Sequence, residues 1–493
     1  MVNLSAATLS SLPVEVPRPA YDRDRVSIGI VHIGVGGFHR AHQAMYLDRL
    51  MNDGQALDWG ICGVGVMPSD RRMAEVMAAQ DGLYTLVVKH PDGTYEPRVI
   101  GSIVDYLFAP DDPEAVVERI AAPSVGIVSL TVTEGGYNIH PVTGEFDATN
   151  PDVRHDLQPS ATPRSVFGLV IEALVRRRDR GAPPLAVVSC DNIQSNGDVA
   201  RRSFSAFARL RGAELGSWVE REVRFANSMV DRITPRTTDD DRAEVASRFR
   251  IDDQWPVVCE PFTQWVLQDT FDRRPPLEDA GVQLVDDVEP YELMKLRLLN
   301  ASHQALCYFA YLAGYRLVHE ATQDPLFARF LRAYMNDEAT PTLEPVPGVD
   351  LEHYKGSLIE RFCNGEVRDT IARLCAETSD RIPKFVLPVI RHNLDHGRPV
   401  ALSSAVVASW ARYAEGVDEE GQPIEVVDPM RDTVMAAARA QRSDRLAFVR
   451  NRELFGDLGD DERFTSAYLT ALEALHDNGA RACLEHLMGA RRR

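Results

Sequence analysis

The chain has 493 residues, of which 44% are hydrophobic and 26% are charged, a composition typical of globular proteins and unlike that of disordered or fibrous ones. Its 54 lysine and arginine residues against 73 aspartate and glutamate residues give a formal net charge of −19. Such a surface repels phosphate backbones and anionic lipids, which argues against nucleic-acid and membrane partners. Because single hydrophobic cores stop growing near ~250–300 residues, this length predicts two domains.

The sequence also predicts the compartment. It contains no uncharged apolar run of about 18 residues and no basic and apolar signal segment at its start. The seven cysteines stand singly, without a C-x-x-C pair, which argues against a disulfide framework and a structural zinc site. We therefore expect a cytoplasmic protein with reduced thiols and no metal.

The first half of the chain alternates strand and helix patterns. Residues 1–24 are rich in Ser, Pro and Asp and predict a loosely ordered lead-in. The β-branched run 26–33 predicts a buried strand, and the apolar spacing over 38–50 predicts a helix. Further strands are predicted at 59–67, 125–132 and 185–190, and further helices near 165–177 and 197–211. This alternation predicts a parallel sheet covered on both faces.

The pattern changes after about residue 285. One long helix is predicted between Pro290 and Gly314, and a surface loop is predicted at 338–350. Helices without intervening strands are predicted at 325–335, 366–376, 401–414, 430–441 and 464–490. The expected fold is α/β, with a Rossmann-like N-terminal domain over 1–285 and a mostly α-helical C-terminal domain over 286–493.

A glycine turn joins the first strand to the first helix. Gly34, Gly36 and Gly37 precede Phe38, so backbone N–H groups and the positive helix end would face a ligand above the strand. The pattern is Gly-x-Gly-x-x-His, an incomplete form of the Gly-x-Gly-x-x-Gly motif. In this strand–turn–helix context it favours dinucleotide binding over a plain tight turn.

Asp70 is the first acidic residue after the second predicted strand. A carboxylate there would accept a hydrogen bond from the ribose 2′-hydroxyl and repel a 2′-phosphate, which favours NAD over NADP. Two alternatives stay open. Ser69 or Asp70 could instead cap the next helix, and Arg71 and Arg72 could attract a phosphate.

The long helix carries polar residues on an otherwise apolar surface. At about 100° per residue, Glu292, Asn300 and His303 fall within about 140° of Lys295. The alternative is a structural polar interface in which Lys295 pairs with Glu292. A desolvated lysine can serve as a general base, and an asparagine amide can donate to a ketone oxygen or an alkoxide. Only four lysines occur, and of these Lys89 and Lys355 are expected at the surface.

The spacing Lys295-x4-Asn300-x2-His303, the glycine turn, the segment Thr131-Val-Thr-Glu-Gly-Gly-Tyr137 and the segment Ser189-Cys-Asp-Asn192 together resemble the polyol-specific long-chain dehydrogenases. The resemblance spans both domains and is greatest to the members that act on mannitol. It implies a monomeric, metal-independent enzyme that transfers hydride between NAD and C2 of D-mannitol, giving D-fructose.

The resemblance also implies residue roles. Lys295 would be the base, Asn192 and Asn300 the oxyanion hole, His303 the residue that orients substrate, and Glu292 a proton relay. Asn192 follows a predicted strand, at the sheet edge where α/β proteins bind ligands. The expected substrate contacts are Asp231, Arg373 and Lys384, and the expected cofactor contacts are Gly34, Gly36, Gly37, Phe38, Asp70, Thr133 and Glu134.

Other functions stay open at this stage. Fructuronate and tagaturonate reductases share the helix motif but must bind a carboxylate, and Arg373 or Lys384 could supply the cation. Arabinitol and sorbitol are further candidate substrates. A nucleotide-binding protein without catalysis is the alternative from a different class.

Overall fold

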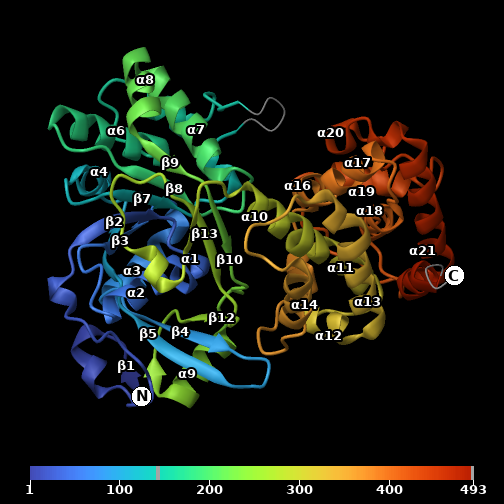
Figure 1. Ribbon diagram of the computed structural model, residues 1–493, viewed down its shortest axis with the longest axis horizontal. Coiled ribbons are helices and arrows are strands. Elements are labelled where there is room, and N and C mark those ends of the chain that lie inside the picture. The colour runs from blue at the N-terminus through green and yellow to red at the C-terminus, as the bar shows by residue number, and fades with distance from the viewer. Residues whose placement is uncertain (140–144, 490–493) are drawn as a thin grey trace. The chain divides into compact units, whose positions relative to one another are not determined.

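The computed structural model describes residues 1–139 and 145–489, and the chain divides into two compact units, Met1–Glu289 and Pro290–Arg493 (Figure 1). Within the described residues, no helix has the length and apolarity needed to cross a membrane.

The first unit is built on a six-stranded parallel sheet in the order β6-β3-β2-β7-β8-β9. Three of its strands, β3, β7 and β8, are buried along their whole length, as expected for strands covered on both faces. This is the Rossmann strand order, so the prediction from strand–helix alternation is confirmed. The strands are β2 (Ile28–Ile33), β3 (Gly60–Gly65), β6 (Ile103–Phe108), β7 (Ile127–Leu130), β8 (Ala186–Ser189) and β9 (Arg224–Ala226).

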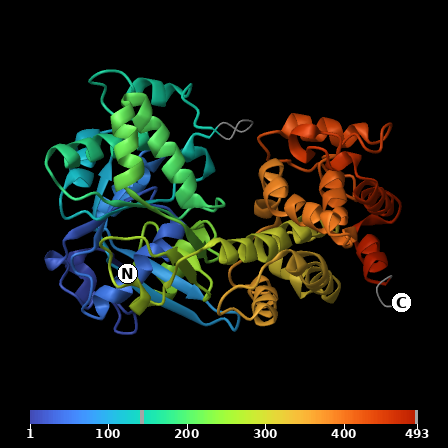
Figure 2. The ribbon, with the colours of Figure 1, turned by 45° about the horizontal axis from the view of Figure 1, so that its top comes forward.

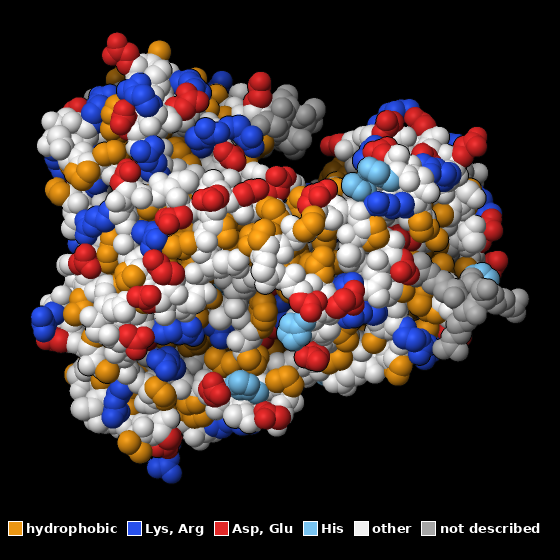
Figure 3. Space-filling model, viewed as in Figure 1, with side chains coloured by type: hydrophobic (Ala, Val, Ile, Leu, Met, Phe, Trp, Pro, Cys, Tyr) orange, Lys and Arg blue, Asp and Glu red, His pale blue; other side chains and the backbone are white. Residues whose placement is uncertain are grey.

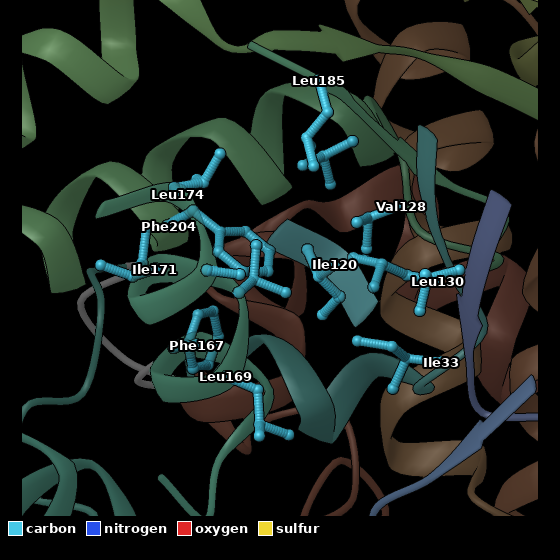
Figure 4. Packing of buried hydrophobic residues seen from close by; sticks show 14 of the residues in the cluster. Ile33, Ile120, Val128, Leu130, Phe167, Leu169, Ile171, Leu174, Leu185 and Phe204 are labelled. Atoms are coloured by element: carbon cyan, nitrogen blue, oxygen red, sulfur yellow. The ribbon is translucent and has the colours of Figure 1, made fainter. Parts of the chain in front are cut away.

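Helices cover both faces of this sheet. On one face, α4 (Pro113–Ala121), α6 (Val166–Asp179) and α7 (Asn196–Arg211) enclose a core of aliphatic and phenylalanine side chains (Figure 4). In both ribbon views α7 runs beside α8 (Ala213–Glu222) (Figures 1 and 2). On the other face, α2 (Gln43–Asn52) and α3 (Arg71–Ala79) pack in a second cluster.

The predicted first helix is broken in two. It consists of α1 (Gly37–Ala41) and α2, separated at His42, whose φ of −125° and ψ of −92° are not helical. The apolar spacing over 38–50 did not reveal this break, because buried residues continue through both halves.

The lead-in is ordered, so the expectation of a loose segment at 1–24 is wrong. Strand β1 (Val2–Asn3) pairs in parallel with β11 (Ile251–Asp252). Leu4, Leu12 and Val16 are buried in a small core of their own. Three isolated apolar residues among polar ones are enough to anchor a segment when a partner surface lies nearby.

Besides the β1–β11 pair, two three-stranded sheets were not predicted. One has the order β12-β4-β5, and the other has the order β10-β13-β14. Their strands are β4 (Tyr84–Lys89), β5 (Tyr95–Ile100), β10 (Ser228–Asp231), β12 (Val257–Cys259), β13 (Gln264–Gln268) and β14 (Gln283–Val285). With three residues each, β12 and β14 are too short for a pattern to stand out. By contrast, β4 and β5 have six residues each, as many as β2 and β3, so length does not explain why they were missed.

The second unit is helical, as predicted. The predicted helix at 366–376 is wrong in extent, because only α15 (Ile371–Leu374) forms there. Residue 490, the last of the predicted helix 464–490, lies outside the described residues. The main helices are α11 (Ala301–Leu312), α12 (Val318–Gln323), α13 (Pro325–Tyr334), α14 (Leu351–Phe362), α16 (Thr378–Phe385), α17 (Leu387–Asp395), α18 (Ala401–Tyr413), α19 (Arg431–Ala440), α20 (Arg452–Phe455) and α21 (Glu462–Gly489).

The segment predicted as a surface loop at 338–350 begins inside the core. Glu338 is fully buried, and its carboxylate accepts hydrogen bonds from the backbone N–H groups of Leu402 (2.7 Å) and Ser403 (2.8 Å) at the start of α18. The acidic residue suggested an exposed loop, but its carboxylate accepts hydrogen bonds from N–H groups that have no partner within α18.

Candidate functional site

The glycine turn has two kinds of glycine. Gly34 has a φ of +95°, and a Cβ there would lie 2.2 Å from the Thr131 carbonyl oxygen, so only glycine fits. At Gly36 and Gly37 the nearest heavy atoms to a Cβ lie at 3.9 and 3.7 Å. The first glycine is therefore required by the protein itself, whereas the next two leave backbone open to a ligand such as a pyrophosphate.

A chain of buried hydrogen bonds supports this turn. The Thr131 hydroxyl donates to the Gly34 carbonyl (2.6 Å) and accepts from Nε2 of His32 (2.9 Å), whose Nδ1 accepts from Ser129 (2.8 Å). Burial lowers the pKa of His32 to about 3. The ring is thus neutral near pH 7 and carries the single N–H that this chain of bonds requires.

Asp70 is half-buried at the end of β3, and its carboxylate does not cap α3. Oδ2 accepts hydrogen bonds from the backbone N–H groups of Val66 (3.0 Å) and Met67 (2.9 Å). Oδ1 accepts none from the described residues. These bonds to the two residues after β3 argue against a capping role for Asp70. The arginines that could attract a phosphate have other contacts, since Arg71 is paired with Asp111 (2.7 Å) and the Arg72 guanidinium lies over Trp255 (5.1 Å).

Asp191 was quoted in a motif but given no role from sequence. Its buried carboxylate accepts hydrogen bonds from the backbone N–H groups of Val132 (3.1 Å) and Thr133 (2.8 Å) and from the Tyr137 hydroxyl (2.7 Å). These bonds hold Thr133 at a φ of +62°, rare for a β-branched residue. They fix the turn that carries Thr133 and Glu134. The one signal in the sequence was an acidic residue directly after a predicted buried strand, in the segment 189–192.

Two expected ligand contacts lie at strand ends in this unit. Asn192 is exposed and follows β8 at its carboxyl end, next to Asp191. Asp231 is the last residue of β10 and is buried. The sheet therefore presents Asn192 at the same carboxyl edge as the glycine turn, Asp70 and Thr133, which is where open α/β sheets bind ligands.

The long helix of the second unit contains a π-helical turn that the sequence did not predict. Between α10 (Glu289–Met294) and α11, residues Lys295–Asn300 form i→i+5 hydrogen bonds, and the Ala301 N–H donates to the Leu296 carbonyl. A π-turn takes more residues than an α-turn, so Asn300 comes closer to the line of Lys295 than α-helical spacing implied. Such turns occur frequently at functional sites.

We call Glu292, Lys295, Asn300 and His303 the polar face. Glu292, Lys295 and His303 are each less than 9% exposed, although all three side chains carry polar or charged groups. The Asn300 Oδ1 is buried and receives no hydrogen bond from the described residues. This oxygen can therefore accept a hydrogen bond from an ordered water or from a ligand hydroxyl.

His303 lies beside a charged pair on a neighbouring segment. Its ring packs against Phe362, with centroids 4.4 Å apart. Asp369 accepts two hydrogen bonds from the Arg373 guanidinium (2.6 and 2.5 Å). Burial alone would raise the pKa of Asp369, but Arg373, with a smaller contribution from His303, holds that pKa below its ordinary value. The structure thus brings His303 and Arg373 together around Asp369, a residue the sequence did not single out.

The other lysines are all paired with acids. Lys384 lies 2.6 Å from Asp380 one helical turn away. The expectation that Lys89 and Lys355 are surface residues is wrong. Lys89 is 4% exposed and bridges Asp241 and Glu244, each at 3.0 Å, and Lys355 is 1% exposed and bonds to Asn336 and Glu352. Polar partners compensate for the burial of both amines, and Asp241, Glu244 and Asn336 are too distant in the sequence for a local pattern to reveal them.

A parallel sheet in this strand order, with a glycine turn after its first strand, defines the Rossmann class of nucleotide-binding folds. Residues 28–279 match the Mannitol dehydrogenase Rossmann domain, and residues 287–476 match the Mannitol dehydrogenase C-terminal domain. The chain belongs to the mannitol dehydrogenase family.

Individual relatives match almost the whole chain. Mannitol 2-dehydrogenase of Aspergillus fumigatus is 47% identical over 469 residues, which cover 94% of this chain and 93% of that protein. Mannitol dehydrogenase 2 of Saccharomyces cerevisiae is 44% identical over 491 residues, covering 99% and 97%.

Two solved structures share the fold throughout. Pseudomonas fluorescens mannitol 2-dehydrogenase, in a ternary complex with NAD and D-mannitol, has a TM-score of 0.92 and 45% identity, with 99% of each chain covered. A substrate-free D-sorbitol dehydrogenase has a TM-score of 0.89 and 39% identity, with 98% and 100% covered.

Proposed function

We propose that this protein is a NAD-dependent polyol dehydrogenase that interconverts D-mannitol and D-fructose at C2. The observation that carries the proposal is the buried polar face, in which the π-turn reduces the angle between Lys295 and Asn300. The family membership and the NAD and D-mannitol bound by the Pseudomonas fluorescens relative support the cofactor and the substrate.

The residues present fit this cofactor. The glycine turn leaves its backbone open at Gly36 and Gly37, and Asp70 keeps Oδ1 available for a ribose hydroxyl. Phe38, Thr133 and Glu134 complete the proposed cofactor contacts. NAD, when bound, accepts or returns the hydride of C2.

The chain's own groups handle the proton and the charge. Lys295 takes the proton from the C2 hydroxyl during oxidation and returns it during reduction, and Glu292 passes it outward. Asn192 and Asn300 donate hydrogen bonds to the C2 oxygen as negative charge develops on it. His303, Asp231, Arg373 and Lys384 orient the polyol. No metal takes part in this proposal, so a chelator such as EDTA should leave the rate unchanged.

Two contacts favour a polyol over a uronate. Arg373 is paired with Asp369, and Lys384 is paired with Asp380. Each candidate cation therefore already has a carboxylate partner, and a substrate carboxylate would have to displace it. D-sorbitol is the second candidate substrate, because the D-sorbitol dehydrogenase relative shares 39% identity over nearly the whole chain.

The test is a substrate panel followed through nicotinamide absorbance. Oxidation of D-mannitol, D-sorbitol and D-arabinitol with NAD, and reduction of D-fructose, fructuronate and tagaturonate with NADH, should give the highest kcat/KM for D-mannitol and D-fructose. Tight NADH binding without turnover of any of these compounds would instead favour a nucleotide-binding protein without catalysis. We further place the enzyme in the cytoplasm, a proposal supported by its seven unpaired cysteines.

A further inference from the structure

Arg71 and Asp111 form an exposed ion pair at the carboxyl edge of the sheet. Arg71 begins α3, directly after Asp70, and Asp111 follows β6, the neighbour of β3. The guanidinium donates to both carboxylate oxygens, at 2.7 and 3.1 Å. It also lies over the Phe108 ring, 4.7 Å from the centroid. Both side chains of the pair are slightly more than half exposed to solvent.

The position of this arginine matters for cofactor choice. An arginine beside the ribose-binding acid is the usual partner of a 2′-phosphate, because the guanidinium can donate two hydrogen bonds to phosphate oxygens. Here the same donors are occupied by Asp111, and the Asp111 charge would repel a phosphate brought close to it. Arg72, the other candidate, packs on Trp255 instead.

We propose that Asp111 is a specificity-determining residue that excludes NADP by holding Arg71 in an ion pair. This inference rests on the proposed cofactor site at Asp70 and adds a second barrier to it. Asp70 repels the 2′-phosphate directly, and Asp111 withholds the cation that would attract it.

The structure supplies a matched control. Arg273 donates to Asp58 (3.2 Å) and lies over the Trp59 ring, also 4.7 Å from its centroid. That pair is similarly exposed. Asp58 stands just before β3, at the opposite end of the strand from Asp70. Asp58→Ala therefore removes the same charge and the same kind of contact away from the proposed cofactor site.

The experiment measures kcat/KM for NADP and for NAD, together with NADPH and NADH affinities from nicotinamide fluorescence. Asp111→Ala should raise the NADP/NAD ratio about tenfold, the scale of one charge-assisted hydrogen bond to phosphate. Asp58→Ala should leave the ratio unchanged. Arg71→Ala combined with Asp111→Ala should return the ratio to the native value, because the released cation is then missing.

An unchanged ratio in Asp111→Ala overturns the proposal, as does an equal rise in Asp58→Ala or a rise that survives the loss of Arg71. Because exposed ion pairs contribute little stability, these variants should fold, which thermal unfolding checks. If the native protein binds NADH without oxidising any polyol, the proposed function fails while the affinity ratios still test the role of Asp111.

Discussion

Lys295 is one of only four lysines among 54 cationic residues, and arginine dominates the rest. The structure gives Lys89, Lys355 and Lys384 acidic partners at the surface or in the core. Lys295 lies on a buried helix, and Glu292, Asn300 and His303 belong to the same polar face. A guanidinium stays protonated near neutral pH, so an arginine at position 295 could not take the proton that the proposed mechanism assigns to Lys295.

The first prediction concerns this proton. Oxidation of D-mannitol should rise with pH and level off once the Lys295 amine has lost its proton, and reduction of D-fructose should fall over the same range. Lys295→Ala should abolish most oxidation, with partial rescue by a small added primary amine. Lys295→Arg should be inactive. Steady-state rates measured across pH check this. A native oxidation rate with a native pH dependence in Lys295→Arg would rule out Lys295 as the general base.

The second prediction concerns the two asparagines. Asn192→Ala and Asn300→Ala should each lower kcat by about 10²–10³, the effect of losing one preorganised donor to a developing oxyanion. NADH affinity, measured separately by fluorescence, should stay near the native value. An unchanged kcat in either variant would mean that the residue has a structural role only.

At the scale of elements, the glycine turn separates two causes of glycine use. Gly34→Ala should destabilise the protein by about 1–3 kcal/mol through its left-handed backbone alone, and the overlap with Thr131 adds to this. Gly37→Ala should leave the unfolding temperature unchanged, because its Cβ meets only a methyl group at 3.7 Å. It should nevertheless weaken NADH binding at least about tenfold, since the methyl would face the pyrophosphate. If both variants changed stability and NADH affinity by equal amounts, Gly34 and Gly37 would not serve different purposes.

Two buried histidines on either side of the glycine turn, His32 on β2 and His39 on α1, form a pH-sensitive pair. His32 and His39 stack with centroids 3.4 Å apart, and burial lowers the pKa of each, that of His32 to about 3. Between the unfolded value near ~6.5 and this folded value, only the unfolded chain binds the proton. The free energy of unfolding should therefore fall on acidification, by up to about 1.4 kcal/mol per pH unit for each histidine.

His39→Phe tests this linkage. The ring nitrogens of His39 make no hydrogen bonds among the described residues, and the side chain borders a small apolar cavity between β2, β7 and β13. A phenyl ring should keep the stack and remove one titrating group. Urea unfolding between pH 7 and about pH 4 should show a slope smaller by about one proton. A slope equal to the native one would assign the acid sensitivity to other groups.

For the whole molecule, charge and surface favour a single copy. The net charge of −19 makes two copies repel each other. Acidic and basic side chains are interspersed over the face shown in Figure 3. Few large hydrophobic side chains are exposed among the described residues: Met1, Val14, Met67, Leu210, Val417 and Val427. Sedimentation equilibrium at physiological salt should therefore give a mass near 54.9 kDa. A mass twice as large would contradict this prediction.

The sequence by itself was sufficient for the features that repeat locally. Strand and helix periods predicted the parallel sheet and the helical second unit, because side-chain direction follows backbone geometry over a few residues. The glycine turn and the polar face could be predicted for the same reason, since their residues are close in the chain.

Only the tertiary structure decided the contacts between distant segments. The Arg71–Asp111 pair joins residues 40 positions apart, and the Asp191 carboxylate fixes a turn that precedes it by about 58. The π-turn Lys295–Asn300 packs against a second π-turn, Met335–Ala339. Arg297 of the first turn donates a hydrogen bond to the Thr342 carbonyl, which lies just after the second. A local pattern could not show the wider turn, because helix periodicity assumes a constant rotation per residue, whereas packing from elsewhere in the chain sets the rotation here.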